Sequence, residues 1–529
     1  MPRSVMEHSF AEVPRANIPR SSFNRSHGHK TTFDADFLVP VLVDDVVPGD
    51  TFNVNMTFFA RLATPLFPIM DNMYLESFFF FVPYRLIWTN WEKMHGAQDD
   101  PADSIDFTVP VCNGSYTVLV GDVAHYMGIP YALDFSVTTD ISALPMRAYN
   151  LIWNEWFRDE NLQDSVTVST GDGPDSAFSN GFSNPPLKRG KRHDYFTSAL
   201  PWPQKGDAVT IPLGVQAPIF SYGANGTDVL VGDDLLNNPG YNTRDLDAST
   251  ANVQYGVNSV SGNLLYADLT YATAATINDL RLAFQTQRLL ERDARSGTRY
   301  NELILSHFGV TVPDFRVQRP EFLGGGSDVI NVTPVAQTSV STATPAADDK
   351  LGQLGGFGTV SGTHGFTKSF TEHGLIIGLV NVRGDITYSQ GIERYWQKST
   401  RYDFYYPVLA QIGEQSILNQ EIWHQGVPAT DQAVFGYTER YNEYRYKPAR
   451  LTGLFSVDAP SSLSAWHLSE DFASLPTLGD TFIQSNTGVP LDRAIAVASE
   501  PHIIFDAYFN MQCARPMPLF GVPGNLDHF

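Results

Sequence analysis

The run of five large apolar residues from Phe78 to Val82 constrains this chain more than any other feature of its sequence. It closes a segment that begins at Met73 and that Pro83 ends. Successive side chains of a strand point to opposite faces, so an unbroken apolar run must be covered on both faces. Left bare, an uncharged segment of high β-propensity would promote aggregation. One face can enter the chain's own core, and the other must meet further elements of this chain or another subunit.

Two other segments alternate between apolar and polar residues, as a half-buried strand does. In the first, one face carries Phe52, Val54, Met56 and Phe58, and the other carries Thr51, Asn53, Asn55 and Thr57. In the second, at residues 501–511, one face carries Ile503, Phe505, Ala507, Phe509 and Met511. Strands near both ends of the chain, with long insertions between them, predict a sandwich whose first and last strands lie together.

Shorter patterns predict the other elements. Strands are expected at residues 37–43, 374–382 and 401–409, and a short amphipathic turn or helix at 88–94. Helices are expected at 144–158 and at 301–308. A third helix is expected to start at Thr276, because Thr276 and Asp279 have the spacing of a capping box. The glycine-rich stretches 324–326 and 352–365 are interpreted as loops rather than core.

Composition favours an all-β body with long connections. Aromatic residues make up 12% of the 529 residues and charged residues only 17%, and helical periodicity is confined to a few places. A net charge of −22 makes the chain as a whole a poor match for DNA phosphates, so any nucleic-acid contact must be local. No run of 18 apolar residues suggests a membrane span, and the first residues lack a secretory signal. Cys112 and Cys513 are expected to be buried thiols rather than a disulfide or a catalytic pair.

Positive charge gathers in two segments. Residues 1–32 carry Arg3, Arg15, Arg20, Arg25 and Lys30, and the second segment carries Lys188, Arg189, Lys191 and Arg192. The first segment is either a frayed terminus or a basic arm that lies along an inner surface or on nucleic acid. The second is a solvated loop, a phosphate contact or an inter-subunit ion pair.

Residues 207–262 are acidic and rich in turn-forming residues, and their only basic residue is Arg244. Short strands joined by tight turns fit this composition best. The segment is expected to be an exposed excursion that faces solvent or an external partner. Its candidate partner-facing carboxylates are Asp228, Asp233, Asp234, Asp245 and Asp247.

Motifs for catalysis, cofactors and metals are absent from the sequence. It has no P-loop, no dinucleotide fingerprint, no zinc-binding spacing and no nucleophile elbow, so we expect no enzyme, no cofactor and no metal. Paired carboxylates such as Asp99 and Asp100 could in principle serve a glycosidase, but they sit in predicted loops. A jelly-roll protein that binds carbohydrate or hydrolyses glycosides, and an intracellular β-rich scaffold, remain the alternatives.

Several stretches resemble one family along nearly the whole chain. They are residues 58–68 (FFARLATPLFP), 71–88 (DNMYLESFFFFVPYRLIW), 194–206 (DYFTSALPWPQKG), 280–290, 391–396 (GIERYW) and 520–524 (FGVPG). In these motifs the sequence is similar to the major capsid proteins of the Microviridae, in particular the gokushovirus branch. Residues 207–262 depart most from that pattern, as a variable surface insertion would.

The resemblance implies an eight-stranded antiparallel jelly roll, a viral β-sandwich with long loop insertions and a few helices. It further implies a T=1 icosahedral shell around a circular single-stranded DNA genome, located in the virion and assembled in the cytoplasm of a host bacterium. Implied partners are copies of the chain itself, the genome, minor capsid proteins including a small basic DNA-binding protein, and a host surface receptor.

Four segments are expected on this basis: an N-terminal arm (1–32), the first part of the jelly roll (33–206), a three-fold protrusion (207–262) and the remainder of the jelly roll (263–529). The two basic segments are the candidates for contact with DNA, and the acidic insertion is the candidate for receptor contact. The phenylalanine-rich strand fits the same interpretation. Because both of its faces are apolar, we expect the chain to be a subunit of a closed shell rather than a solitary soluble molecule.

Overall fold

The structure is a computed structural model of the whole chain. It describes residues 19–97, 99–113, 116–135, 141–176, 185–207, 209, 219–221, 265–267, 277–295, 306, 318–336, 338 and 354–520. The chain divides into two compact units, one formed by Met1–Pro203 with Thr311–Phe529 and the other by Gln204–Val310.

The first unit contains fifteen strands among its described residues. They are β1 (Ser21–Asn24), β2 (His27–Phe33), β3 (Val39–Val46), β4 (Thr51–Leu62), β5 (Met73–Pro83), β6 (Val111–Asn113), β7 (Ile141–Ser142), β8 (Asp175–Ser176), β11 (Glu321–Val329), β12 (Asn331–Ala336), β13 (Leu354–Ser369), β14 (Gly374–Gly384), β15 (Glu414–Leu418), β16 (Val434–Glu439) and β17 (Ile503–Arg515).

Helices in the described part of this unit are short. They are α1 (Tyr84–Ile87), α2 (Trp91–Met94), α3 (Val123–Tyr126), α4 (Leu144–Ile152) with the π-helical turn η1 (Trp153–Phe157), α7 (Asn419–Ile422), α8 (Pro428–Asp431), α9 (Asp480–Ile483), α10 (Gly488–Ala494), and the 3₁₀ turns η3 (Arg394–Gln397), η4 (Arg401–Asp403), η5 (Pro407–Gln411), η6 (Asn442–Tyr444), η7 (Gly453–Phe455) and η8 (Ser464–Trp466). The second unit has β9 (Ile219–Ser221), β10 (Leu265–Ala267) and α5 (Ile277–Arg295), which confirms the helix predicted after Thr276.

Two antiparallel sheets form the body of the first unit. One has the strand order β1-β17-β4-β13-β12, with β2 also paired to β17, and the other has the order β11-β5-β14-β3. A hydrophobic core that includes Phe52, Phe505, Phe79 and Ile376 draws on both sheets. The predicted β-sandwich is therefore confirmed. The sheets have six and four described strands, so an eight-stranded jelly roll is not established by their topology.

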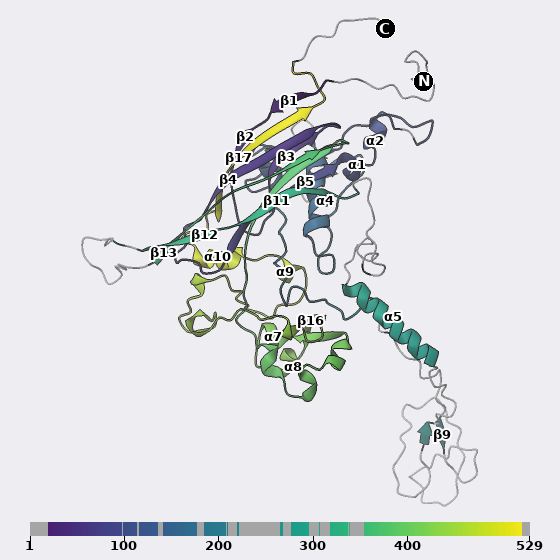
Figure 1. Cartoon of the computed structure of the whole chain (residues 1–529), viewed down its shortest axis with the longest axis vertical. Coiled ribbons are helices and arrows are strands. Elements are labelled where there is room, and N and C mark those ends of the chain that lie inside the picture. The colour runs from purple at the N-terminus through teal and green to yellow at the C-terminus, as the bar shows by residue number, and fades with distance from the viewer. Residues whose placement is uncertain are drawn as a thin grey trace, which may run out of the picture. The chain divides into compact units, whose positions relative to one another are not determined.

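The two ends of the chain meet in the larger sheet. Strand β17 lies between the N-terminal strands β1 and β2 on one side and β4 on the other (Figure 1). Its residues alternate as predicted, with Phe505 and Phe509 buried and Ile504 and Tyr508 exposed. The C-terminal part of the predicted basic arm (1–32) is thus not a frayed terminus, because its residues 21–24 and 27–32 are strand residues paired with β17.

The phenylalanine-rich strand β5 is covered on both faces, as predicted. Phe79 and Phe81 enter the core between the sheets. Phe80 and Val82 enter a second core that α1, α3 and α4 complete, where Phe80 contacts the rings of Trp156 and Phe157. Each fully buried ring contributes roughly 1.5–3 kcal/mol. The inference that the second face requires another subunit is wrong, because helices and loops of the same chain cover it.

Two glycine-rich stretches that were predicted as loops are strands. Residues 324–326 lie in β11, beside β5, and residues 354–365 belong to β13, beside β4. A Cβ atom at Gly325 would overlap the carbonyl oxygen of Ser77, and one at Gly365 would overlap that of Val54. Glycine at these positions therefore allows neighbouring strands to approach closely; it does not mark a flexible loop.

The predicted strand at 401–409 is also wrong, because that segment forms the 3₁₀ turns η4 and η5. The helix predicted at 301–308 lies outside the described residues apart from residue 306. Both cysteines are buried free thiols, as predicted, and burial raises the pKa of Cys112 to about 12. Among the helices that the structure describes, none has the length and apolar character needed to cross a membrane.

Candidate binding and assembly surfaces

The basic segment Lys188–Arg192 is held against the body of the first unit. Lys191 Nζ lies 2.9 Å from Glu470 Oε1, and both side chains are buried. Arg192 Nη1 lies 3.1 Å from Asp385 Oδ1. Arg189 forms an ion pair with Glu76. Lys188 differs, because its ammonium group lies over the Phe37 ring at 5.4 Å from the centroid. Three of the four predicted cations thus have acidic partners inside the chain, which the sequence pattern did not reveal.

Glu76 on β5 is the centre of these ion pairs. Besides Arg189, it accepts a hydrogen bond from Arg383 Nε at 3.0 Å and lies 3.8 Å from Arg192 Nη2. Burial and the neighbouring Arg383 lower the pKa of Arg189 to about 10, although Glu76 opposes this. Arg383 also donates to the carbonyl of Gly190 at 3.0 Å. One carboxylate therefore ties β5 and β14 to the basic segment.

Of the five N-terminal cations predicted to contact DNA, the structure describes three. Arg3 and Arg15 lie outside it. Arg20 Nη2 donates to Thr51 Oγ1 at 2.9 Å, and Arg25 Nη1 lies 2.6 Å from the buried Asp44 Oδ2. Lys30 is 79% exposed and lies 3.5 Å from Asp506 Oδ1. Arg20 and Lys30 therefore remain open to an additional anionic partner at one edge of the larger sheet.

The acidic candidates of the insertion, Asp228, Asp233, Asp234, Asp245 and Asp247, all lie outside the described residues. Within residues 207–262, the structure describes residues 207, 209 and 219–221 only. The proposed role of the insertion thus depends on its sequence.

Ser77, His364 and Asp328 form a trio that has the composition of a catalytic triad. Ser77 Oγ lies 2.6 Å from His364 Nδ1, and His364 Nε2 lies 3.0 Å from Asp328 Oδ2. A nucleophile must be reachable by a substrate, but Ser77 is only 1% exposed. The trio joins β5, β13 and β11, so we assign it to the stability of the sandwich.

Four partly or largely buried histidines predict acid sensitivity of the folded chain. Burial lowers the pKa of His29, His364, His373 and His467 below 6.5. The unfolded chain therefore binds more protons than the folded chain as the pH falls through 6.5, so the free energy of unfolding should decrease. Urea denaturation between pH 7.5 and 5.5 measures this, and a free energy of unfolding that rises on acidification would contradict the prediction.

A surface formed by nine exposed large apolar side chains lies on η3, η4, η5 and η6 and the connections between them. Its members, which we call the aromatic face, are Tyr395, Trp396, Tyr402, Phe404, Tyr405, Tyr406, Val408, Ile412 and Tyr444. Val408 is 83% exposed and Trp396 is 71% exposed. Exposed apolar residues scattered singly need no explanation, whereas grouped ones are typical of an interaction site. Part of this group is joined in space, because the Tyr405 and Tyr444 rings contact each other and Tyr395 and Tyr444 line one cavity.

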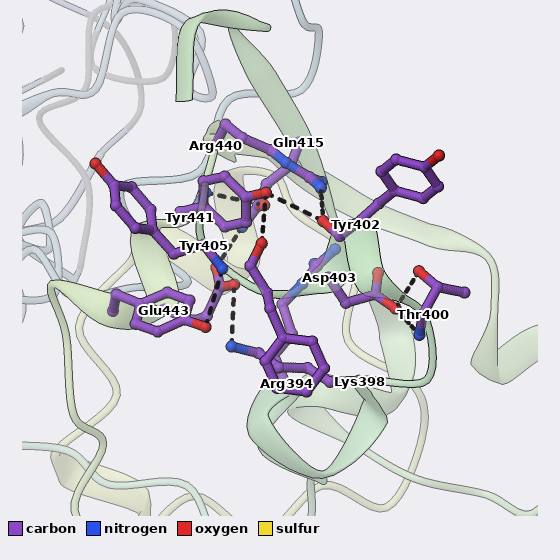
Figure 2. A network of polar contacts seen from close by, with 12 residues as sticks. Arg394, Lys398, Thr400, Tyr402, Asp403, Tyr405, Gln415, Arg440, Tyr441 and Glu443 are labelled. Carbon is purple, nitrogen blue, oxygen red and sulfur yellow. Dashed lines mark hydrogen bonds and ion pairs between the residues drawn. The ribbon is translucent and has the colours of Figure 1, made fainter. Parts of the chain in front are cut away.

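Hydrogen bonds hold the backbone under the aromatic face in one conformation (Figure 2). Thr400 and Asp403 form a capping box that begins η4. Tyr441 Oη lies 3.1 Å from the carbonyl oxygen of Tyr402 and 2.9 Å from that of Phe404. Arg440 Nη2 also donates to the Tyr402 carbonyl, at 2.8 Å. A segment without strand pairing is thus fixed by side chains of a neighbouring segment.

Tyr441, which supports this arrangement, has a strained backbone. Its φ of 62° lies in the left-handed region, which is a genuine outlier for a bulky residue. Its N–H donates to Gln415 Oε1 at 3.1 Å, and Gln415 Nε2 donates to Glu443 Oε2 at 2.7 Å. Strain of this kind costs about 1–3 kcal/mol and persists only where surrounding contacts enforce it.

A cavity of about 260 Å³ adjoins the aromatic face, and Tyr395 and Tyr444 contribute to its lining. On its inner side, Glu421 accepts hydrogen bonds from Arg394 and from Tyr195 Oη, both at 3.0 Å. Burial raises the pKa of Glu421, and Arg394 opposes this. Near the mouth, hydrogen bonds from Arg450 and Lys447 lower the pKa of Glu393 to about 2. The cavity wall combines aromatic rings with charges that are already paired.

A β-sandwich with an exposed, rigid aromatic face and a triad-like trio that is closed to substrate fits the class of structural, assembling proteins. The family described as "Capsid protein (F protein)" matches residues 11–525, and the chain belongs to this family. It is thus a structural capsid protein, which implies self-assembly into a shell and location in the virion.

Three relatives named "Capsid protein VP1" align with almost the whole chain. The protein of Bdellovibrio phage phiMH2K is 45% identical over 542 residues, which cover 99% of this chain and 98% of the relative. That of Chlamydia phage 1 is 40% identical and covers 98% of both chains. That of Spiroplasma virus 4 is 34% identical and covers 98% of this chain and 97% of the relative. The resemblance to Microviridae capsid proteins of the gokushovirus type is confirmed.

Proposed function

We propose that this chain is the major capsid protein of a small phage and assembles into a T=1 icosahedral shell around a circular single-stranded DNA genome. The single observation that carries the proposal is the full-length similarity to capsid proteins VP1. The sandwich is then a viral jelly roll with additional strands at its edges. The shell forms in the cytoplasm of a host bacterium and also contains minor capsid proteins, among them a small basic DNA-binding protein.

Expression of the chain in bacteria tests this proposal. Light scattering coupled to size exclusion should give the mass of a closed shell, and nuclease treatment should leave protected DNA inside genome-filled particles. A protein that remains a small oligomer at every concentration, with or without its minor partners, would contradict the proposal. That outcome would favour the carbohydrate-binding jelly-roll alternative.

We assign genome contact first to the N-terminal basic segment, with Arg3, Arg15, Arg20, Arg25 and Lys30 as its cations. Arg20 and Lys30 support this assignment because both are exposed, Arg20 directly before β1 and Lys30 on β2. The segment Lys188–Arg192 is a second candidate, chiefly through Lys188, whose ammonium group has no carboxylate partner among the described residues. The other cations of that segment would have to exchange internal partners for phosphate.

Neutralising two of these cations should weaken binding of single-stranded DNA. The double variant Arg20→Gln, Lys30→Gln should reduce the slope of log K against log salt by about 1.4, since each lost phosphate contact removes about 0.7. Fluorescence anisotropy with a labelled oligonucleotide measures the slope. Arg445→Gln is the control, because Arg445 is exposed and paired with Glu439 away from this edge. An unchanged slope in the double variant would refute the assignment.

We further propose that residues 207–262 form a protrusion at the three-fold axes that contacts a host surface receptor. Asp228, Asp233, Asp234, Asp245 and Asp247 are its candidate contact residues, because they concentrate negative charge in a segment with one basic residue. Particles that lack residues 222–262 should assemble but adsorb poorly to host cells. Normal adsorption by such particles would contradict this role.

A further inference from the structure

We propose that a second copy of this chain covers the aromatic face in the assembled shell. The inference rests on the proposed function, and it names the surface through which subunits meet. It replaces the phenylalanine-rich strand as the apolar element that requires a neighbour. That strand is buried within its own chain, whereas the aromatic face is not.

The area of the face matches what a stable contact needs. Aromatic side chains bury roughly 150–250 Å² each when fully covered. The nine members of the face are between 40% and 83% exposed, so covering all of them would remove roughly 800 to 1,300 Å² from water. Stable interfaces bury about 800 Å² on each partner. Covering most of these side chains would therefore supply the area of one specific protein contact.

Rigidity supports an interface rather than a loop that collapses inward. The capping box at Thr400, the hydrogen bonds from Tyr441 and Arg440, and the strained backbone at Tyr441 all hold the apolar side chains outward. In an isolated chain this arrangement costs free energy and leaves 40–83% of each apolar side chain exposed to water. A partner that binds a preformed surface avoids the entropy of ordering it, so the cost is offset on assembly.

The chemistry of the face favours a protein partner over single-stranded DNA. Val408 and Ile412 are among its exposed members, and aliphatic side chains do not stack on bases. The ammonium group of Lys398 lies over the Tyr444 ring at 3.7 Å from the centroid and 3.9 Å from Glu443 Oε1. Its charge is therefore already paired within the chain. Tyrosine, tryptophan and arginine are the residues that dominate the energy of protein interfaces.

The adjoining cavity gives the contact a place for an inserted side chain. Its lining includes Tyr195, Tyr395, Tyr444 and Tyr446, with charges that are paired inside the chain. Anchor side chains that fill pockets beside exposed aromatic residues are typical of interface centres. A capsid protein binds copies of itself, so a second copy is the occupant that fits both the face and the cavity.

Two single substitutions test the proposal. Val408→Asp and Trp396→Ser each change a side chain that is more than two-thirds exposed, so the melting temperature of the unassembled subunit should stay close to that of the wild type. Each should raise the concentration needed for assembly at least ~30-fold, as expected for a residue at an interface centre. Val489→Asp is the matched control, because Val489 is 62% exposed outside the face.

Light scattering measures assembly, and thermal melting of unassembled subunits confirms folding. Hydroxyl-radical footprinting adds a readout that needs no variant: Trp396 and Tyr402 should be modified in free subunits and at least ~10-fold more slowly in shells. Assembly of both variants at the wild-type concentration, with Trp396 equally reactive in shells, would overturn the inference. Normal shells that fail to retain DNA would also overturn it and would assign the face to the genome. Failure of the wild-type chain to assemble would instead refute the proposed function.

Discussion

Replacing Glu76 by Gln is expected to lower the free energy of unfolding by about 3–5 kcal/mol, the usual cost of removing one partner from a buried charge network. Glu76 is 8% exposed and is the shared partner of Arg189, Arg192 and Arg383. Glutamine keeps the size of the side chain but leaves the positive charge of three guanidinium groups without this neutralising partner. Burial already disfavours the positive charge of Arg189, and the pKa of this guanidinium group is therefore lowered to about 10. Urea denaturation of unassembled subunits measures the loss.

Glu439→Gln is the control for this experiment. Glu439 also pairs with an arginine, Arg445, but the two side chains are 51% and 57% exposed. Exposed ion pairs contribute about 0–1 kcal/mol, so this variant should unfold close to the wild type. Equal effects of the two substitutions would show that the network around Glu76 does not anchor the basic segment.

The second large effect is expected at Gly325, where alanine should destabilise the folded chain by about 3 kcal/mol or more. An alanine Cβ would overlap the backbone carbonyl of Ser77 on the neighbouring strand. Backbone atoms cannot move aside as a flexible side chain can, so β11 would have to separate from β5. The variant should therefore fold poorly, which its circular dichroism and melting temperature will reveal.

Gly171→Ala provides the matched comparison. A Cβ atom at Gly171 would meet no atom within 4 Å, and its backbone is not in the left-handed region. Alanine there should leave stability unchanged or raise it slightly, since it restricts the unfolded chain. A Gly325→Ala variant as stable as Gly171→Ala would mean that the glycines of β11 are not required for strand packing.

Much of the sandwich could be predicted because its strands follow simple burial patterns. The alternation in β4 and β17 identified their buried faces correctly, and the unbroken apolar run in β5 identified a strand covered on both sides. The apolar run could not reveal which elements bury the second face of β5. Helix α4 and the loops around it are distant in sequence from β5, so only the tertiary structure shows that they belong to the same chain.

The glycine-rich strands were missed because glycine usually marks turns. In β11 and β13 it serves close approach between strands, and no local pattern distinguishes the two uses. The ion pairs of Lys188–Arg192 were missed for a similar reason. Their partners Glu76, Asp385 and Glu470 are at least about one hundred residues away in sequence.

The aromatic face was mistaken for a strand because residues 401–409 are rich in Tyr, Phe and Val, which have high β-propensity. Two local signals pointed the other way. Thr400 and Asp403 have the spacing of a capping box, and Pro407 cannot donate a hydrogen bond to a sheet. Only the structure could show that these residues form turns and expose their apolar side chains, instead of forming a strand of a sheet.

Electron cryo-microscopy of nuclease-treated particles tests the central claim most directly. We expect a closed T=1 shell in which each copy places Trp396 and Tyr402 against a neighbouring copy, with DNA density beside the edge formed by β1 and β2. Particles without icosahedral order, or a shell in which Trp396 and Tyr402 face solvent on every copy, would contradict it.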